Sequence, residues 1–217
     1  PTLVLTDRGG NSREVFRTGW ESVRNHGLSS TLVHKSKLEG WTIVTSPDAN
    51  RGGDNGFEIW SDGDLMQNQQ NALRLVQPAQ DDGRNWLELN DATGRGHQTL
   101  GIERAVDTVA GATYTLGLDY AGRIGYSTDY TAIGIYVDGQ RIGGYAATSP
   151  GTALDWRAIQ FQFTGTGGSR TIRIVTEATQ VDRNGRGAMI DDIALIEVLP
   201  SNTGYEDTII QLSAISA

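Results

Sequence analysis

The stretch TYTLGLDY, residues 113–120, alternates large apolar residues with small or polar ones along its whole length. The alternation places Tyr114, Leu116, Leu118 and Tyr120 on one face, as expected for a strand with one side in a hydrophobic core. Because a helix repeats about every 3.6 residues, this period of two predicts β structure.

The same alternation recurs on both sides of this stretch. Residues 131–144 carry it up to Asp138-Gly139, a dipeptide typical of a tight hairpin turn. Residues 158–178 predict two strands joined by a glycine-rich turn, and the apolar residues expected to face inward in these two regions are Ile133, Ile135, Val137, Ile159, Phe161, Phe163, Ile172 and Ile174. Other strand-like stretches are GWTIVT (40–45), GFEIW (56–60), NWLELN (85–90), QTLGIERAV (98–106) and MIDDIALIEV (189–198). Together they predict roughly nine antiparallel strands, and therefore an all-β domain with two packed sheets, a jelly roll or β-sandwich.

The alternation divides the chain into three parts. Residues 40–199 carry the predicted sandwich. Residues 1–39 show little alternation, so we expect a partly irregular N-terminal segment that packs on the main domain or ends a preceding or split domain. Residues 200–217 follow the last strong strand and are expected to be a linker and the start of another β repeat.

The charge and composition exclude several classes of partner. The 217-residue chain has a formal net charge of −8 and a pI near 4.8, so it repels the phosphates of nucleic acid and the anionic surface of a membrane. The absence of cysteine removes disulfides, thiolate nucleophiles and thiolate zinc sites. The sequence has no run of about 18 apolar residues, the length that would predict a membrane-spanning helix. A surplus of carboxylates suits hard divalent cations such as Ca²⁺.

No catalytic motif stands out in the sequence. There is no G-x-S-x-G, H-E-x-x-H or P-loop pattern. Glu58, Glu88 and Glu103 are candidates for a paired-carboxylate glycosidase on count alone, but nothing marks a partner for any of them. Glu88, between Leu87 and Leu89, is predicted to point outward from its strand. We therefore expect a binding protein and not an enzyme.

Five stretches, taken in order, resemble one known module. They are GFEIWSDGD (56–64), NWLELN, ERAVDTVAGATYTLGLDYAGR (103–123), YTAIGIYVDGQRIG (130–143) and MIDDIALIEV. They resemble the galactose-binding-like jelly-roll module of bacterial repeats-in-toxin (RTX) adhesins. The resemblance implies a monomeric, calcium-dependent ligand-binding module within a long secreted or cell-surface chain. Its ligand would be a short peptide held by its free C-terminal end. A lectin-like module on the same fold and a structural spacer of the adhesin fibre stay open as alternatives.

The resemblance also implies a structural calcium site. In related modules the first strand lies beside the last, which would here bring together Asn55, Glu58, Asp191 and Asp192. Three carboxylates on adjacent strands repel one another unless a cation or protons compensate their charge, and Ca²⁺ bound by six to eight oxygens would do so. The alternative is an exposed sheet edge with solvated acids.

A ligand site is expected where polar loops gather at one end of the sandwich. Asp62 and Asp64 flank a glycine and offer oxygens to a second, ligand-facing calcium, although such a turn is also common in solvent. Arginines suit a peptide carboxylate, and aromatic side chains provide flat walls. The residues expected to contact the ligand are Trp60, Asp62, Asp64, Asn90, Asp91, Arg123, Tyr126, Asp129, Tyr130, Arg183, Asn184 and Arg186. Core packing is expected for Trp86 and Trp156.

Overall fold

The computed structural model describes residues 12–23, 28–44, 56–79, 83–89, 100–180 and 185–199. Almost all of its regular structure is β. The strands are β1 Ser12–Thr18, β2 Thr31–Val33, β3 Lys37–Leu38, β4 Trp41–Val44, β5 Phe57–Ser61, β6 Leu65–Gln67, β7 Leu73–Leu75, β8 Asn85–Leu89, β9 Gly101–Asp107, β10 Thr113–Gly122, β11 Ile133–Val137, β12 Gln140–Tyr145, β13 Arg157–Thr164, β14 Ser169–Thr176 and β15 Ala188–Val198. The helix α1, Thr128–Thr131, has four residues. No helix of the described ranges is long and apolar enough to cross a membrane.

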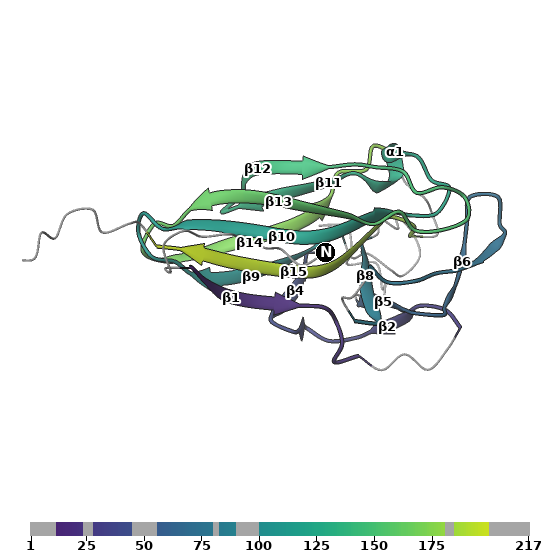
Figure 1. The fold of residues 1–217 in the computed structure, drawn as a ribbon, viewed down its shortest axis with the longest axis horizontal. Coiled ribbons are helices and arrows are strands. Elements are labelled where there is room, and N and C mark those ends of the chain that lie inside the picture. The colour runs from purple at the N-terminus through teal and green to yellow at the C-terminus, as the bar shows by residue number, and fades with distance from the viewer. Residues whose placement is uncertain are drawn as a thin grey trace, which may run out of the picture.

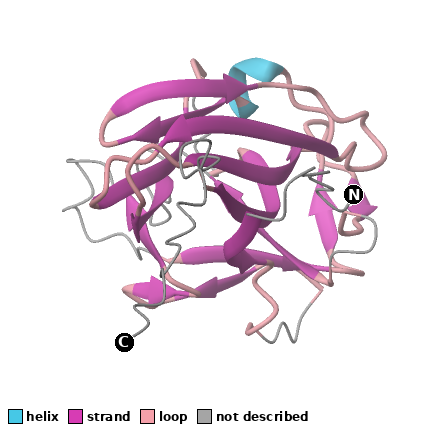
Figure 2. Cartoon of the chain, turned by 60° about the vertical axis from the view of Figure 1, so that its left-hand side comes forward, coloured by secondary structure: helices cyan, strands magenta, loops and turns pink. Residues whose placement is uncertain are grey.

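The strands form two packed antiparallel sheets. Sheet A has the order β13-β10-β15-β8-β5-β2, and β1 also pairs with β15. Sheet B has the order β12-β11-β14-β9-β4-β3, while β6 and β7 form a separate hairpin. The elongated strands run along the molecule in Figure 1, and the turned view in Figure 2 shows that they lie in layers. The prediction of a two-sheet antiparallel sandwich is confirmed.

The alternating residues of β10 lie at the centre of the main core. Tyr114, Leu116, Leu118 and Tyr120 are all buried, and the Tyr114 ring stacks on Phe163 with their centroids 5.2 Å apart. The inward residues predicted for β11, β13 and β14 belong to the same core or pack against it. Each large apolar side chain that is fully buried contributes about 1.5–3 kcal/mol. The prediction from period two is therefore confirmed for these strands.

The N-terminal segment is more regular than expected, as far as it is described. β1 pairs with the second half of β15, and Phe16, Trp20 and Leu38 lie in the main core. The pairing register shifts between Glu14 and Phe16, and this bulge breaks the alternation by which a strand is recognised in a sequence. Residues 12–23 and 28–39 thus pack in the sandwich. That the segment ends a preceding or split domain stays a prediction, and residues 1–11 and 200–217 lie outside the described part.

Sheet A is covered on both faces at one end. Ile59 and Leu87 point into the main core, so Trp60 and Trp86 point to the opposite face. There they join a second cluster with Met66 of the hairpin, Val76, Ala121, Ile124 and Met189, against which Leu154 and Trp156 pack. Fully buried Trp86 agrees with the expected core packing, whereas Trp156 is half-buried and packs against Trp86 edge to face at 5.9 Å. The β6–β7 hairpin therefore turns an outer sheet face into a second interior.

Candidate ligand-binding site

A buried carboxylate lies at the base of the polar loops. Glu88 of β8 is fully buried under the β6–β7 side of sheet A, although its position between Leu87 and Leu89 predicted a residue facing outward. Its carboxylate accepts two bonds from Arg123 Nη1, at 2.6 and 2.7 Å, one from Trp60 Nε1 at 2.8 Å and one from the Gly187 amide at 2.9 Å. The side chain does point away from the main core, but the second cluster covers it. We call Glu88, Arg123, Trp60 and the Gly187 amide the Glu88 hub.

Arg123 is the cation of this hub. Only 5% of the residue is exposed, and its Nη2 and Nε atoms donate to the Gln67 carbonyl at 3.2 and 3.4 Å. Its guanidinium also lies 5.4 Å from the Trp60 ring, which is itself buried. These contacts correct the expectation that Arg123 and Trp60 lie open to a ligand. They instead connect β5, β6, β8 and the segments that contain residues 123 and 187.

Four side chains gather above the hub, and we call them the loop-end cluster: Gln67, Tyr126, Tyr130 and Arg186. Arg186 donates from Nη1 to the Tyr126 hydroxyl and from Nη2 to Gln67 Oε1, the latter at 2.6 Å. The Tyr126 and Tyr130 rings meet edge to face at 5.4 Å. Tyr126 is buried, whereas Gln67, Tyr130 and Arg186 are half-buried and keep contact with solvent. Three residues predicted to contact the ligand are thus brought together.

The helix α1 positions Tyr130 and Asp129 in this cluster region. The hydroxyl of buried Tyr120 donates to the Thr131 carbonyl at 2.7 Å, which fixes the end of α1 to β10. Burial raises the pKa of Tyr120, so its phenol keeps the proton that this bond needs. Asp129 is exposed, and its backbone carbonyl accepts a bond from the Gln180 amide. An exposed carboxylate and a half-buried tyrosine are therefore consecutive residues at the loop end, and Asp129 Oδ1 accepts a bond from the Thr179 hydroxyl at 3.4 Å.

The acids of the SDGD turn are divided between the interior and solvent. Asp64 is buried, and its Oδ2 accepts the Ser61 amide at 2.8 Å, so its carboxylate holds its own turn together. Gly63 between the two acids has a φ of +88°, a conformation that favours glycine. Asp62 alone is exposed. This geometry corrects the expectation that Asp64 faces a ligand.

The last strand, β15, does not lie beside β5 as expected. β8 lies between β5 and β15, which puts those two strands about 9–10 Å apart. Glu58 lies opposite Glu88 and accepts a bond from the Ser30 hydroxyl at 2.7 Å. The strand beside β15 near Asp192 is β1, so the expectation that β5 lies next to β15 is wrong, and the metal site built on Glu58, Asp191 and Asp192 stays a prediction. Asn55 lies outside the described residues, which contain no group of three or more His, Asp or Glu side chains arranged to hold a metal. Calcium stays a prediction.

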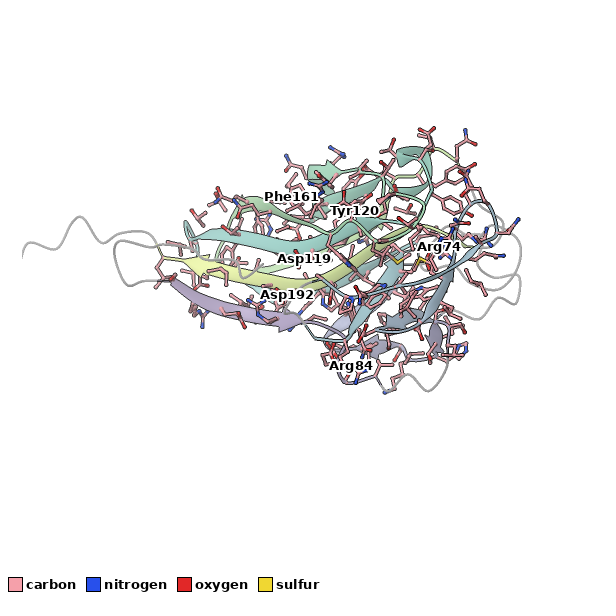
Figure 3. All side chains as sticks on the ribbon, turned by 45° about the vertical axis from the view of Figure 1, so that its right-hand side comes forward. Arg74, Arg84, Asp119, Tyr120, Phe161 and Asp192 are labelled. Carbon is pink, nitrogen blue, oxygen red and sulfur yellow. The ribbon has the colours of Figure 1, made fainter. Side chains whose placement is uncertain are left out.

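The acids of β15 sit at a bulge in the sheet. Asp191 lies directly opposite Asp119 of β10, and both are buried. Asp192 has a φ of +42° and forms an ion pair with Arg17. Asp119 and Asp192, labelled in Figure 3, line a cavity of about 20 Å³ over β10, β13 and β15. A space of this size holds a single water and not a sugar or a peptide residue.

The remaining predicted residues cannot be placed in this site. Asn90, Asp91, Arg183 and Asn184 lie outside the described residues. Their neighbours in the chain do converge, because Ala188 pairs with both Leu89 and Gly122. The loops that leave these strand ends therefore start from the same end of the sandwich as the loop-end cluster. Glu88 and Gln67 were missed by sequence reasoning, although Trp60 of β5 and Trp86 of β8, in phase with Glu58 and Glu88, signal a covered outer face.

Comparisons with known proteins extend the description of the fold. No family model and no curated protein matches the chain. Among solved structures, the Stig cyclase Fisc from Fischerella sp. TAU in complex with (3Z)-3-(1-methyl-2-pyrrolidinylidene)-3H-indole has a TM-score of 0.56 and 12% identity over 86% of this chain and 98% of that one. A cyclase from Fischerella sp. TAU in complex with 4-(1H-indol-3-yl)butan-2-one has a TM-score of 0.53 and 15% identity over 84% and 96%. These likenesses show a shared fold alone.

Proposed function

We propose that this chain is a ligand-binding module whose loop-end cluster captures the free C-terminal end of a short peptide. The observation that carries the proposal is the Glu88 hub beneath the cluster. Its ion pair holds the Gln67 carbonyl and the Gly187 amide, which adjoin two members of the cluster. The hub therefore fixes the backbone from which Gln67 and Arg186 project.

The cost of the hub supports a functional role for the loops it fixes. A buried ion pair is often no more stabilising than well-packed apolar side chains of similar volume, because two charges lose their hydration. Its rigidity is useful where side chains must be held in a fixed arrangement, as in a binding site supported by a second layer of contacts. We infer that the hub is there to preorganise the loop end.

The chemistry of the cluster suits a carboxylate ligand with an apolar neighbour. Arg186 is half-buried, and its Nη1 and Nη2 atoms donate to the Tyr126 hydroxyl and to Gln67 Oε1. In the proposal a carboxylate replaces these two oxygens, because its two oxygens match the planar guanidinium. The half-buried ring of Tyr130, which buried Tyr126 supports edge to face, offers an apolar surface for the last side chain of a peptide. Calcium dependence is part of the proposal, supported by the net charge of −8 and the exposed carboxylates of Asp62 and Asp129.

The biological setting in the proposal rests on the ordered stretches of sequence described above. They support a monomeric module of a long bacterial RTX adhesin, secreted or at the cell surface, with a binding role and no catalysis. The burial of Glu88 against Arg123 agrees with a structural role for this acid, since its charge is already paired.

A carbohydrate ligand is the second candidate. Exposed Asp129 and half-buried Tyr130 both belong to α1, and a carboxylate and an aromatic ring at one loop end suit the hydroxyls and the apolar face of a sugar. The arginine in the cluster favours the peptide, because a neutral sugar has no group that matches the charged fork. A spacer role predicts no ligand for the cluster.

Isothermal titration calorimetry separates these functions. The protein in calcium is titrated with a free-carboxylate tripeptide, its C-terminally amidated form, a panel of monosaccharides and 4-(1H-indol-3-yl)butan-2-one, and again after EDTA. The proposal predicts heat from the free-carboxylate peptide alone, and its loss on chelation. Heat from sugars alone would make the module a lectin, and silence from every ligand would leave the spacer.

A further inference from the structure

An arginine without a described carboxylate partner lies on another side of the sandwich. Arg104 of β9 is half-buried and lies near β1 and the β3–β4 turn, away from the loop-end cluster. Its guanidinium carbon lies 3.9 Å from the centroid of the Phe16 ring, and its Nη1 donates to the Glu39 carbonyl at 3.0 Å. Phe16 itself packs edge to face against Trp41 of β4 at 5.7 Å. The guanidinium therefore rests on a fixed aromatic surface.

The backbone at Gly40 packs against the same guanidinium. A Cβ atom at Gly40 would lie 2.7 Å from both Cζ and Nη1 of Arg104, so any other residue would displace the group. Gly40 also has a φ of +92°, which disfavours side chains. The ring of Phe16 and the backbone at Gly40 thus hold the guanidinium in place before any ligand arrives.

The Nε–Nη2 edge of Arg104 remains available. Within the described residues neither Nε nor Nη2 donates a hydrogen bond, and no carboxylate oxygen lies within ion-pair distance of the Arg104 guanidinium. Neither atom is among the described buried atoms that lack a partner, so both keep contact with solvent. By contrast, Arg13, Arg17, Arg123, Arg141, Arg157, Arg170 and Arg173 all pair with acids.

The segment whose carbonyl binds Arg104 also carries the lysines of this acidic chain. The chain has two lysines, Lys35 and Lys37, and both are exposed in the segment just before Glu39. The carboxylate of Glu39 is turned toward the Trp20 and Ser22 amides, each at 3.0 Å, while its carbonyl faces Arg104. Burial lowers the pKa of Arg104, which reflects the partial loss of water around its charge. The guanidinium is already partly dehydrated, so an anion that binds this edge displaces fewer water molecules than it would at an exposed arginine.

We propose that the Nε–Nη2 edge of Arg104 is a second binding site, which takes a carboxylate group through two parallel N–H···O bonds. This edge matches the two oxygens of a carboxylate, and the held guanidinium loses little freedom when the bonds form. The ligand chemistry is that of an acidic sugar or of a peptide carboxylate. The site is separate from the loop-end cluster, so its existence does not depend on the proposed function of that cluster.

NMR detection of the arginine Nε–Hε signals tests the site directly. The protein is titrated with glucuronate and N-acetylglycine, and with their neutral counterparts glucose and N-acetylglycinamide. The proposal predicts that both carboxylates shift the Arg104 signal and that neither neutral compound does. The tighter carboxylate identifies the source, an acidic sugar or a peptide. An unmoved Arg104 signal, or an equal shift with the neutral compounds, would overturn the proposal.

Two variants provide the control. Arg104→Gln removes the fork, and we expect carboxylate affinity at this site to fall about tenfold or more. Arg173→Gln removes an arginine of the same sheet whose Nε is already paired with Glu103 at 2.6 Å, and it leaves the affinity unchanged. Equal affinity in the wild type and Arg104→Gln would refute the site, and the wild-type Arg104 signal decides the matter if that variant does not fold.

Discussion

Replacing Arg123 with methionine tests the energetic basis of the Glu88 hub. The change keeps an apolar stem against Trp60 but removes the cation from a carboxylate that is 0% exposed. The Trp60 and Gly187 donors remain, yet neither carries charge. Breaking a buried pair in this way costs about 3–5 kcal/mol, because the remaining charge stays buried without compensation. In a chain of this size that cost lowers the melting temperature by about 6–20 °C.

A double-mutant cycle distinguishes this mechanism from a simple loss of packing. Adding Glu88→Gln to Arg123→Met removes the stranded charge, while the amide oxygen can still accept from Trp60 and Gly187. We expect the double variant to recover much of the stability lost in Arg123→Met, with a coupling energy of about 1 kcal/mol or more. The matched surface control is Arg173→Met, whose pair with Glu103 is exposed and contributes about 0–1 kcal/mol. Urea unfolding of all variants measures these terms. A loss in Arg123→Met no larger than in Arg173→Met, or strictly additive changes, would refute the reasoning.

Three further predictions concern other parts of the sandwich. The hydrogen bond from Arg13 is the largest influence on the pKa of Glu197, and with a smaller one from Tyr114 it holds this pKa below its usual 4.5 although burial raises it. The contribution of Glu197 to stability is therefore full above pH 4.5 and is lost as the pH falls through the lower folded value. The melting-temperature gap between wild type and Glu197→Gln should shrink in acid, and a constant gap would contradict this linkage. Gly122→Ala puts a Cβ about 2.3 Å from the Ala147 carbonyl oxygen and should lower the free energy of unfolding by about 1–3 kcal/mol. In the same urea assay Gly168→Ala, whose Cβ meets nothing within 4 Å, should leave it almost unchanged. Similar losses of stability in both variants would show that the close approach at Gly122 is not the cause. If Asp192 takes part in a calcium site, Asp192→Ala lowers the melting temperature more in calcium than in EDTA, and equal losses would leave its ion pair with Arg17 as the explanation.

The parts of the fold that follow from local alternation were predictable from the sequence. β10, β11, β13 and β14 each have one face in the main core, so a period of two was enough to identify them and to orient their side chains. β1 was missed because its bulge places Val15 and Phe16 next to each other against the pattern. The grouping of Glu58 with Asp191 and Asp192 came from the resemblance, and it placed β5 beside β15, where the structure has β8 and β1.

The candidate site depended on contacts that no local pattern records. Tyr126, Tyr130 and Arg186 were predicted from their loops, and the pairing of Gly122, Ala188 and Leu89 explains why those loops meet. The burial of Glu88 and Arg123 depends on the β6–β7 hairpin folding back over sheet A, a tertiary event that also makes Trp60 and Trp86 interior residues. Arg104 was not considered at all, since its surroundings come from β1, β4 and the turn at Gly40.

The central claim is that the loop-end cluster binds a carboxylate ligand, and a comparison of arginine variants tests it most directly. Calorimetry with the free-carboxylate tripeptide in calcium is carried out on the wild type, Arg186→Gln, Arg104→Gln and Arg173→Gln. We expect the affinity of the loop-end site to fall about tenfold or more in Arg186→Gln, and to stay unchanged in the other two variants. Undiminished binding by a correctly folded Arg186→Gln would contradict the claim, and a loss confined to Arg104→Gln would place the binding site at the other side of the sandwich.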